Sequence, residues 1–532
     1  MAGKFRPGHE HSALSATLLL TAAVMLSRVI GYVREMYIAW QFGATGQTDV
    51  FVAAFTLPDW LNYFLAGGTA SITFISIYSR FLAQNKEEEA QKTFSVIVTV
   101  MTTVLIVGVA VAEIFTPEIL RWWLKDFTPE RIAACTYLTR ILLPAQLFFY
   151  VGGVISAILQ SRRLFLFPAL APLIYNVFII LGGVLLARPL GISSLAYGAL
   201  AGAFLGPFLV NALGASKIGT GYRISFAVNN AAFREWVRLS VPLMLGVSLV
   251  TADDWILRRI ASGDVGGISL LNYAKRLFAV PIAVLGQAAG QASLPFFARL
   301  FGEKKREEFA ATVNATVYRI VALSCLTTAL MMSAALPMVD LLMRRGRFTF
   351  VNSQEVAVYL FWFSLSLAFW AAQGLYARAF YAAGDTLTPM VAATLITVAT
   401  YPFYRYLYGL YSLTGLALAS DFGIAVNTIA LAMLLHWRGL VKISGLRWKE
   451  LFKAGIVAVL AGVFSFHVAR VFPVEGRRLS DLAAIVVATL TWGAAVAGGL
   501  WLLKSDLPDV LRRRERATAA AADPQGPSTP AS

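Results

Sequence analysis

The sequence predicts an all-α protein that crosses a membrane many times. Of its 532 residues, 58% are hydrophobic and only 14% are charged, and a soluble protein of this composition would lack the polar residues needed to cover its surface. The apolar segments reach about 18 residues or more, which favours spanning helices over barrel strands. We therefore expect a polytopic membrane protein with about 14 transmembrane helices.

The expected helices follow one another along almost the whole chain. Their centres lie near residues 28, 65, 102, 147, 176, 202, 247, 284, 322, 367, 397, 424, 462 and 491. The first segment is expected to remain as a spanning helix, because no small-residue cleavage site closes it and the apolar run continues past Arg28.

Lys and Arg residues give the chain a formal net charge of +16 and gather in alternate loops. The loops on one side of the expected spans carry Arg80, Lys86, Lys92, Arg162, Arg163, Lys217, Arg223, Arg299, Lys304, Arg438 and Lys442. This distribution predicts that both termini are cytoplasmic. It also favours contact with anionic membrane lipids over binding of nucleic acid, which we do not expect.

Signals for enzymatic chemistry are weak. Cys135 and Cys325 are isolated in apolar segments, and the four histidines show no metal-ligand spacing. The chain has no Walker motif for nucleotide phosphates. We therefore expect a transporter rather than an enzyme, without a metal site of the zinc type or a bound cofactor.

Two halves of the sequence repeat each other at a distance of about 221 residues. "RRLFLFP", which ends at Pro168, falls on "GDTLTP", which ends at Pro389. "SLAYGALAG" falls on "GLALASDFG", and a slip of two residues brings Arg80 onto Arg299. Six spans in each copy is an even number, so both copies enter the membrane from the same side, as in transporters with parallel repeats.

The repeat predicts two six-helix lobes and an additional C-terminal pair of helices. The expected divisions are a cytoplasmic N-terminal tail (1–12), an N-lobe (13–218), a C-lobe (219–440), a helix pair (441–505) and a basic, disordered cytoplasmic tail (506–532).

Charged residues inside the expected spans are the candidate functional residues, because a charge at bilayer depth costs a few kcal/mol. Arg28, Arg34 and Glu35 lie in the first span, and Lys275 and Arg276 lie in the eighth. One interpretation is an anion-binding cavity in which guanidinium forks and an ammonium match a pyrophosphate. The alternative is simple ion pairing between helices, such as Arg28 with Glu35 or Asp254 with Arg258. Gly31 is either a packing position or a hinge.

Several motifs resemble the MurJ (MviN) family, the lipid II flippases of the multidrug/oligosaccharidyl-lipid/polysaccharide exporter superfamily. They are "SRVIGYVRE", "FGATGQTDVFVAAFTLP", "TRILLPAQ", "FPALAPLIYN", "VPLMLGVS", "NYAKRLFAVP", "LMRRGRFT" and "GDTLTP". The resemblance implies fourteen helices whose last pair forms a groove for a lipid. It also implies translocation of undecaprenyl-pyrophosphate-linked peptidoglycan precursor from the cytoplasmic to the outer leaflet of the bacterial inner membrane.

The resemblance also assigns site residues one position at a time. Arg28, Arg34, Asp49 and Arg276 match positions that the family uses, and Glu35 keeps the expected acidic charge. The chain departs from the family pattern at Asn62, Tyr63, Gly67, Lys275 and Ala279. Since Asn62 and Tyr63 replace an arginine pair, we interpret Lys275 as a residue that restores positive charge.

The resemblance further implies that sodium or the membrane potential drives the cycle, with Asp254 and Asp385 as candidates for a cation site. Expected partners are the lipid-linked precursor, membrane lipids and cell-wall synthesis or division proteins. The alternatives are an exporter of another polyprenyl-linked glycan, a multidrug antiporter and a non-transporting cell-wall scaffold.

Overall fold

The computed structural model describes residues 13–66, 68–245, 249–472 and 478–510. Every regular element within these ranges is a helix, and they contain no strand, which confirms the all-α class. The predicted N-terminal tail, Gly67 and most of the predicted C-terminal tail lie outside the described residues.

The chain forms two compact units. Unit 1 comprises Met1–Val247, Asp254–Asn272 and Arg345–Thr349, and unit 2 comprises Ser248–Asp253, Tyr273–Arg344 and Phe350–Ser532. Two helices therefore contribute residues to both units. The lobe boundaries drawn from the repeat stay a prediction.

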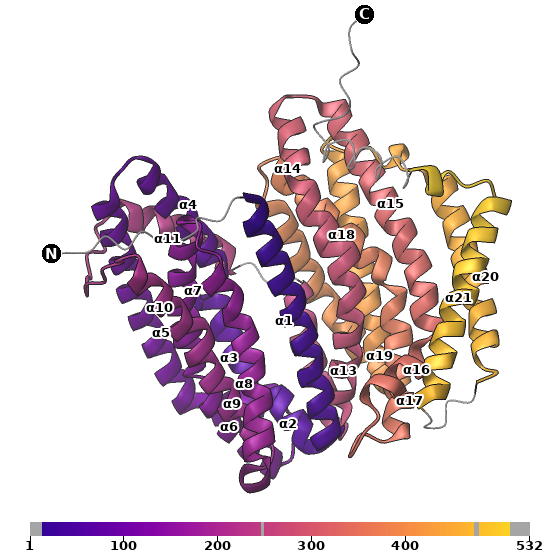
Figure 1. The fold of residues 1–532 in the computed structure, drawn as a ribbon, viewed down its shortest axis with the longest axis horizontal. Coiled ribbons are helices and arrows are strands. Elements are labelled where there is room, and N and C mark those ends of the chain that lie inside the picture. The colour runs from indigo at the N-terminus through magenta and orange to yellow at the C-terminus, as the bar shows by residue number, and fades with distance from the viewer. Residues whose placement is uncertain (1–12, 67, 246–248, 473–477, 511–532) are drawn as a thin grey trace, which may run out of the picture. The chain divides into compact units, whose positions relative to one another are not determined.

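Unit 1 is built from helices of the first half of the chain (Figure 1). They are α1 (Ala13–Phe42), α2 (Gly46–Ala54), α3 (Thr56–Leu61), the π-helix η1 (Asn62–Ala66), α4 (Gly68–Ala83), α5 (Glu87–Trp123), α6 (Pro129–Leu142), α7 (Ala145–Ser161), α8 (Leu166–Leu190), α9 (Ser193–Ala203), the π-helix η2 (Phe204–Val210), α10 (Asn211–Lys217) and α11 (Ala231–Leu245). Helix α12 (Leu249–Ile260) and the 3₁₀ turn η3 (Ala261–Gly263) follow. Thr45 and Thr128 cap α2 and α6 with their side chains, as expected of N-cap threonines. Phe74, Tyr78 and Trp236 are among the fully buried core side chains.

Unit 2 is built mainly from the second half of the chain. Its helices are α13 (Gly267–Pro281, shared with unit 1), the π-helix η4 (Ile282–Ala288), α14 (Ala289–Gly302), α15 (Arg306–Ser333), α16 (Ala335–Met343), α17 (Phe350–Leu365), α18 (Leu367–Ala382), α19 (Leu387–Trp437), the 3₁₀ turn η5 (Ile443–Gly445), α20 (Trp448–Ala469) and α21 (Arg478–Leu502). Helices α20 and α21 lie side by side, and α20 also packs on α15 (Figure 1). Both helices of the pair supply core residues, including Val457 and Leu500.

The sequence repeat reappears in the backbone. Helix α8 begins at Leu166 and α19 at Leu387, 221 positions later. Gly191 ends α8 with φ 54° and ψ −137°, and Ser412 breaks α19 with φ 53° and ψ −137° at the corresponding position. The slip of two residues seen between Arg80 and Arg299 is also present, because α5 begins at Glu87 and α15 at Arg306.

The described residues contain nine helical segments, some of them made of consecutive helices, that are long and apolar enough to cross a membrane, or ten when one bent pair is joined. Helix α19 counts once, although its 51 residues would extend about 76 Å at 1.5 Å per residue, more than twice the bilayer core. The break at Ser412 therefore divides it into two segments of spanning length. Fourteen spans stays a prediction.

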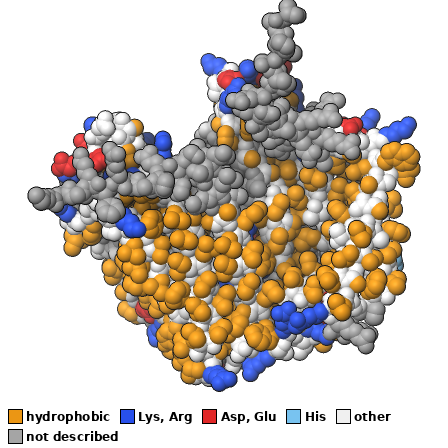
Figure 2. Space-filling model, viewed as in Figure 1, with side chains coloured by type: hydrophobic (Ala, Val, Ile, Leu, Met, Phe, Trp, Pro, Cys, Tyr) orange, Lys and Arg blue, Asp and Glu red, His pale blue; other side chains and the backbone are white. Residues whose placement is uncertain are grey.

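The surface of the helices is apolar. Figure 2 shows hydrophobic side chains over most of the visible face, with Lys and Arg toward its margins. Leu185 on α8 is 70% exposed and Leu490 on α21 is 67% exposed. A contiguous apolar surface of this kind is suited to lipid rather than to water.

Candidate functional site

Helix α1 holds an arginine in a defined position within unit 1. Arg34 Nη2 lies 2.5 Å from Glu35 Oε1, and Arg34 Nη1 donates to Asn176 Oδ1 of α8 at 2.9 Å. The Asn176 amide is oriented by its own bond to the Pro172 carbonyl at 3.0 Å, and Glu35 also accepts from Asn272 at 3.5 Å. Two of the predicted residues, Arg34 and Glu35, thus form an ion pair. Glu35 compensates the charge of the Arg34 guanidinium, and Asn176 fixes its orientation.

The other predicted residues of α1 face more open surroundings. Arg28 is exposed and lies six residues before Arg34 on the helix. Among the described residues, a Cβ added at Gly31 would meet no heavy atom within 4 Å. Close packing therefore does not require glycine at this position.

Asp49 forms a closed set of hydrogen bonds. Its side chain is fully buried, and it accepts from the backbone N–H groups of Gly266 at 2.6 Å and Ser269 at 2.9 Å, and from the Ser269 hydroxyl at 2.9 Å. Arg131 Nη2 adds an ion pair at 2.9 Å, and its guanidinium lies 3.9 Å from the centre of the Phe127 ring. These bonds connect α2 to α6 and to the start of α13. They also occupy both carboxylate oxygens of Asp49, so its role is structural.

Asn62 begins the π-helix η1 and is exposed. Close to it in the chain, Asp59 Oδ2 accepts from Arg258 Nη1 of α12 at 2.8 Å. The ring of Tyr63 packs edge-on against Trp255 at 5.7 Å between centroids. A guanidinium therefore reaches this region from α12, and the ion pair of Arg258 with Asp59 was not foreseen in the sequence.

In unit 2, Lys275 is engaged by a buried carboxylate. Lys275 Nζ lies 2.5 Å from Asp253 Oδ2, and Asp253 is 1% exposed. Asp253 also accepts from the hydroxyls of Tyr404 at 2.5 Å and Ser420 at 2.9 Å. The charge of Lys275 is thus compensated in this conformation. Arg276, the next residue, is exposed.

The two candidate cation residues, Asp254 and Asp385, have different surroundings. Asp385 accepts from the backbone N–H and hydroxyl of Thr388, at 2.9 and 2.7 Å, and forms an ion pair with Arg438. A bound cation would be repelled by that guanidinium. Asp254 lies half-buried on α12, in unit 1. Within the described ranges, no group of three or more His, Cys, Asp or Glu side chains could hold a metal ion.

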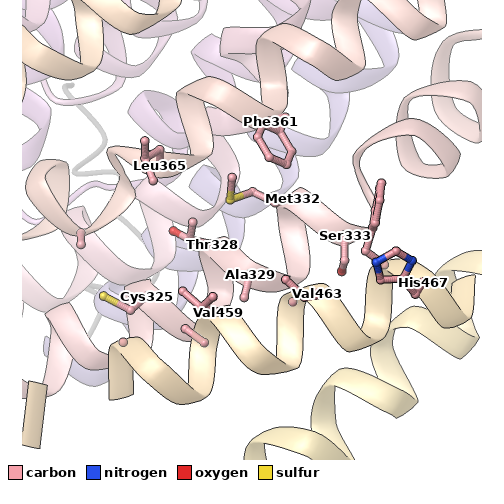
Figure 3. A pocket seen from close by; sticks show the side chains of 15 residues that line it. Cys325, Thr328, Ala329, Met332, Ser333, Phe361, Leu365, Val459, Val463 and His467 are labelled. Atoms are coloured by element: carbon pink, nitrogen blue, oxygen red, sulfur yellow. The ribbon is translucent and has the colours of Figure 1, made fainter. Parts of the chain in front are cut away.

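Unit 2 also contains an apolar pocket with a volume of about 580 Å³ (Figure 3). Side chains from α15, α17 and α20 point into it, among them Met332, Phe361 and Val463. The hydroxyls of Thr328 and Ser333 and the imidazole of His467 are its main polar groups. The resemblance implied a lipid groove formed by the C-terminal helix pair, whereas this pocket is lined by α15, α17, α18 and, of that pair, α20.

The partners of the charged residues are not evident from the sequence. Asn176 lies within the motif "FPALAPLIYN", but its bond to Arg34 joins residues 142 positions apart. Asp421 stands alone in the apolar stretch "GLALASDFG". A carboxylate inside an expected span is itself a signal of function. This signal could have identified Asp421 as a candidate functional residue.

The helices are apolar enough to span a membrane, they carry ion-paired charged residues, and the backbone of the first half is repeated in the second. Together these features are those of a polytopic membrane transporter. The family model described as "Lipid II flippase MurJ" matches residues 38–477. The chain therefore belongs to the MurJ family, which confirms the family predicted from its motifs.

Individual relatives agree with the family match. The chain is similar to the lipid II flippase MurJ of Burkholderia cenocepacia, with 27% identity over 92% of this chain and 97% of that protein. It is also similar to the probable lipid II flippase MurJ of Vibrio cholerae, with 26% identity over 81% of this chain and 84% of that protein.

Solved structures show the same fold. A lipid II flippase MurJ in an inward closed conformation has a TM-score of 0.76 at 20% identity and covers 91% of this chain and 99% of its own. An inward-facing multidrug resistance transporter of the MATE family has a TM-score of 0.65 at 14% identity over 80% of this chain and 98% of its own. The chain thus shares its fold with a lipid II flippase and with a multidrug resistance transporter.

Proposed function

We propose that this protein moves lipid II, the undecaprenyl-pyrophosphate-linked peptidoglycan precursor, from the cytoplasmic to the outer leaflet of the bacterial inner membrane. The observation that carries the proposal is the family match over residues 38–477. The proposed orientation has both termini in the cytoplasm, in keeping with the distribution of positive loops. The proposed cycle is alternating access without chemistry on the substrate.

The head group is proposed to bind through Arg28, Arg34, Lys275 and Arg276. Arg34 supports this role because Glu35 and Asn176 already fix its guanidinium, and a pre-oriented fork loses little freedom when it meets a phosphate. An arriving pyrophosphate would compete with Glu35 for Arg34 and with Asp253 for Lys275. Differential binding of this kind is what allows a ligand to shift a two-state equilibrium.

The isoprenyl tail is proposed to use the pocket between α15, α17, α18 and α20. The pocket is apolar and has a volume of about 580 Å³, which suits part of a hydrocarbon chain. Gly455 lines it, and a Cβ there would meet nothing within 4 Å. Gly455→Phe should therefore fill the pocket without a backbone clash and lower flipping at least tenfold, whereas Gly493→Phe, an equally open position on α21, should not.

Sodium or the membrane potential remains the proposed driving force, and cell-wall synthesis or division proteins remain proposed partners. No step is assigned to a bound sodium ion, because Asp385 is occupied by Arg438 and Thr388.

The proposal is tested by depleting a bacterium of its own flippase and expressing variants of this chain. Wild type should restore growth and prevent accumulation of inward-facing lipid II. Arg34→Ala should fail, Arg34→Lys should restore activity in part, and the exposed Arg188→Ala should behave as wild type. If wild type reaches the membrane and inward-facing lipid II still accumulates, the proposed substrate is wrong. Full rescue by Arg34→Ala would remove Arg34 from the head-group site.

A further inference from the structure

Unit 2 contains a second buried carboxyl group beside the pair formed by Asp253 and Lys275. Asp421 follows Ser420 on α19 and is only 8% exposed. Among the described residues, none donates a hydrogen bond to either of its carboxyl oxygens. Asp421 lies close enough to Asp253 and Lys275 to interact electrostatically with both. The cluster therefore holds two carboxyl groups and one ammonium.

The hydrogen bonds decide which carboxyl group is ionised. Asp253 accepts from Lys275, Tyr404 and Ser420, so its charge is compensated and its oxygens are satisfied. Asp421 has no such donor, and the hydroxyl of Ser366, at the start of α18, donates to the Phe363 carbonyl at 2.9 Å. An ionised Asp421 would be a buried, unpaired charge next to a like charge, which costs several kcal/mol.

We propose that Asp421 is a proton-binding site of unit 2, which carries a proton at neutral pH while Lys275 is paired with Asp253. The groups that face it are Asp253 from α12, Lys275 from α13, Tyr404 from the first part of α19 and Ser366 from α18. Movement of Lys275 away from Asp253 would leave the charge of Asp253 uncompensated and favour binding of a second proton there. Because proton binding at Asp421 requires no lipid, this inference goes beyond the proposed function.

A proton suits the cluster better than a metal cation. The ammonium of Lys275 already stands where a cation would approach Asp253, 2.5 Å from its oxygen. The hydroxyls of Tyr404 and Ser420 act as donors to Asp253, so their oxygens are not turned toward a shared metal ion. A second positive ion would be repelled by the ammonium, whereas a neutral carboxylic acid would not.

The test is infrared spectroscopy of the purified full-length protein at pH 7. Protonated carboxylic acids have a C=O stretching band that carboxylates lack, and this band shifts in D₂O. Asp421→Asn should lose the intensity of one such group, and Asp385→Asn, which removes an ion-paired carboxylate, should lose none. An unchanged band in correctly folded Asp421→Asn protein would overturn the proposal.

A second variant keeps the test decisive should Asp421→Asn misfold. Lys275→Gln removes the ammonium, so Asp253 should become protonated and the band should gain the intensity of one group. The double variant Asp253→Asn/Lys275→Gln should return to the wild-type intensity. No gain in Lys275→Gln would contradict the charge balance on which the proposal rests. Replacement of potassium by sodium in the buffer at constant pH should leave the wild-type band unchanged. Loss of the band in sodium would identify a metal cation as the ligand instead.

Discussion

Single carboxylates do much of the structural work in unit 1. Asp49 is the clearest case, because four donors converge on one buried side chain. Two of them are backbone N–H groups at the start of α13, so one aspartate holds a chain segment more than 200 positions away. Removal of such a group leaves several donors unsatisfied at once.

Asp49→Ala should lower the stability of the protein by about 3–5 kcal/mol, because it leaves Arg131 as a partly buried, unpaired charge and orphans two N–H groups. The measurement is thermal unfolding of the purified protein. Glu88→Gln, at an exposed position on α5, is the matched control and should leave the melting temperature unchanged. A loss below 1 kcal/mol for Asp49→Ala would show that water replaces the carboxylate.

Asp385 gives a pH dependence with a defined sign. Partial burial raises the pKa of this carboxyl, but the hydrogen bonds from Thr388 and the Arg438 guanidinium outweigh it, so that the pKa lies below its usual value. Stability from Asp385 is therefore present above the unfolded pKa of about 3.9 and is lost as the pH falls through the folded pKa.

Asp385→Asn should cost up to about 1 kcal/mol at pH 7, because it removes the charge that pairs with Arg438 while the amide oxygen can still accept from Thr388. The difference from wild type should vanish in strongly acidic solution, where Asp385 is protonated in both states. Melting temperatures of the two proteins across this pH range provide the check. A constant difference at all pH values would mean that the charge of Asp385 is not involved.

At the scale of elements, the two backbone corners after α8 and within α19 are the clearest common feature of the two halves. Gly191 and Ser412 share a conformation with positive φ, which glycine adopts freely and other residues adopt at a cost of about 1–3 kcal/mol. Side chains around the corners differ, so the backbone conformation was kept while the residues changed.

Ser412→Gly should raise the free energy of unfolding by about 1 kcal/mol, because glycine adopts positive φ without strain. Gly191→Ala should lower it by a similar amount. A Cβ has room at Gly191, so the cost arises from the backbone conformation alone. Gly409→Ala, in regular helix with open space around it, is the control and should not destabilise. Chemical or thermal unfolding measures all three. A destabilised Ser412→Gly would show that the serine side chain itself holds the corner.

The elements also show what can be read from the sequence. The motifs "RRLFLFP" and "GDTLTP" predicted corresponding positions, and the structure starts α8 and α19 two residues before their prolines. The break at Ser412 could not be read, because serine seldom adopts positive φ. The partners of Arg34 and Lys275 were also beyond reach, since those contacts join residues far apart in the chain and depend on packing rather than on periodicity.

At the scale of the whole molecule, the apolar surface implies that the helices are solvated by lipid. On α21, Leu490 is 67% exposed and Leu479 is 82% exposed, yet the first lies in the middle of the helix and the second in its first turn. Equal exposure in water would give equal tolerance of charge, whereas a membrane distinguishes the two depths.

Leu490→Arg should therefore impair membrane insertion by about 3 kcal/mol, the cost of arginine near the centre of a spanning helix. Leu479→Arg should have little effect, because its guanidinium can reach the interface. The amount of each variant recovered in the membrane fraction measures the difference. Equal recovery would indicate that the face around Leu490 is not in contact with lipid.

The matching corners at Gly191 and Ser412 point to an ancestral gene duplication. A half-length precursor that assembled as a pair would have carried the same bend twice, once per copy. After fusion, each copy was free to acquire its own ionic chemistry, while both kept the bend, with glycine in the first copy and serine in the second.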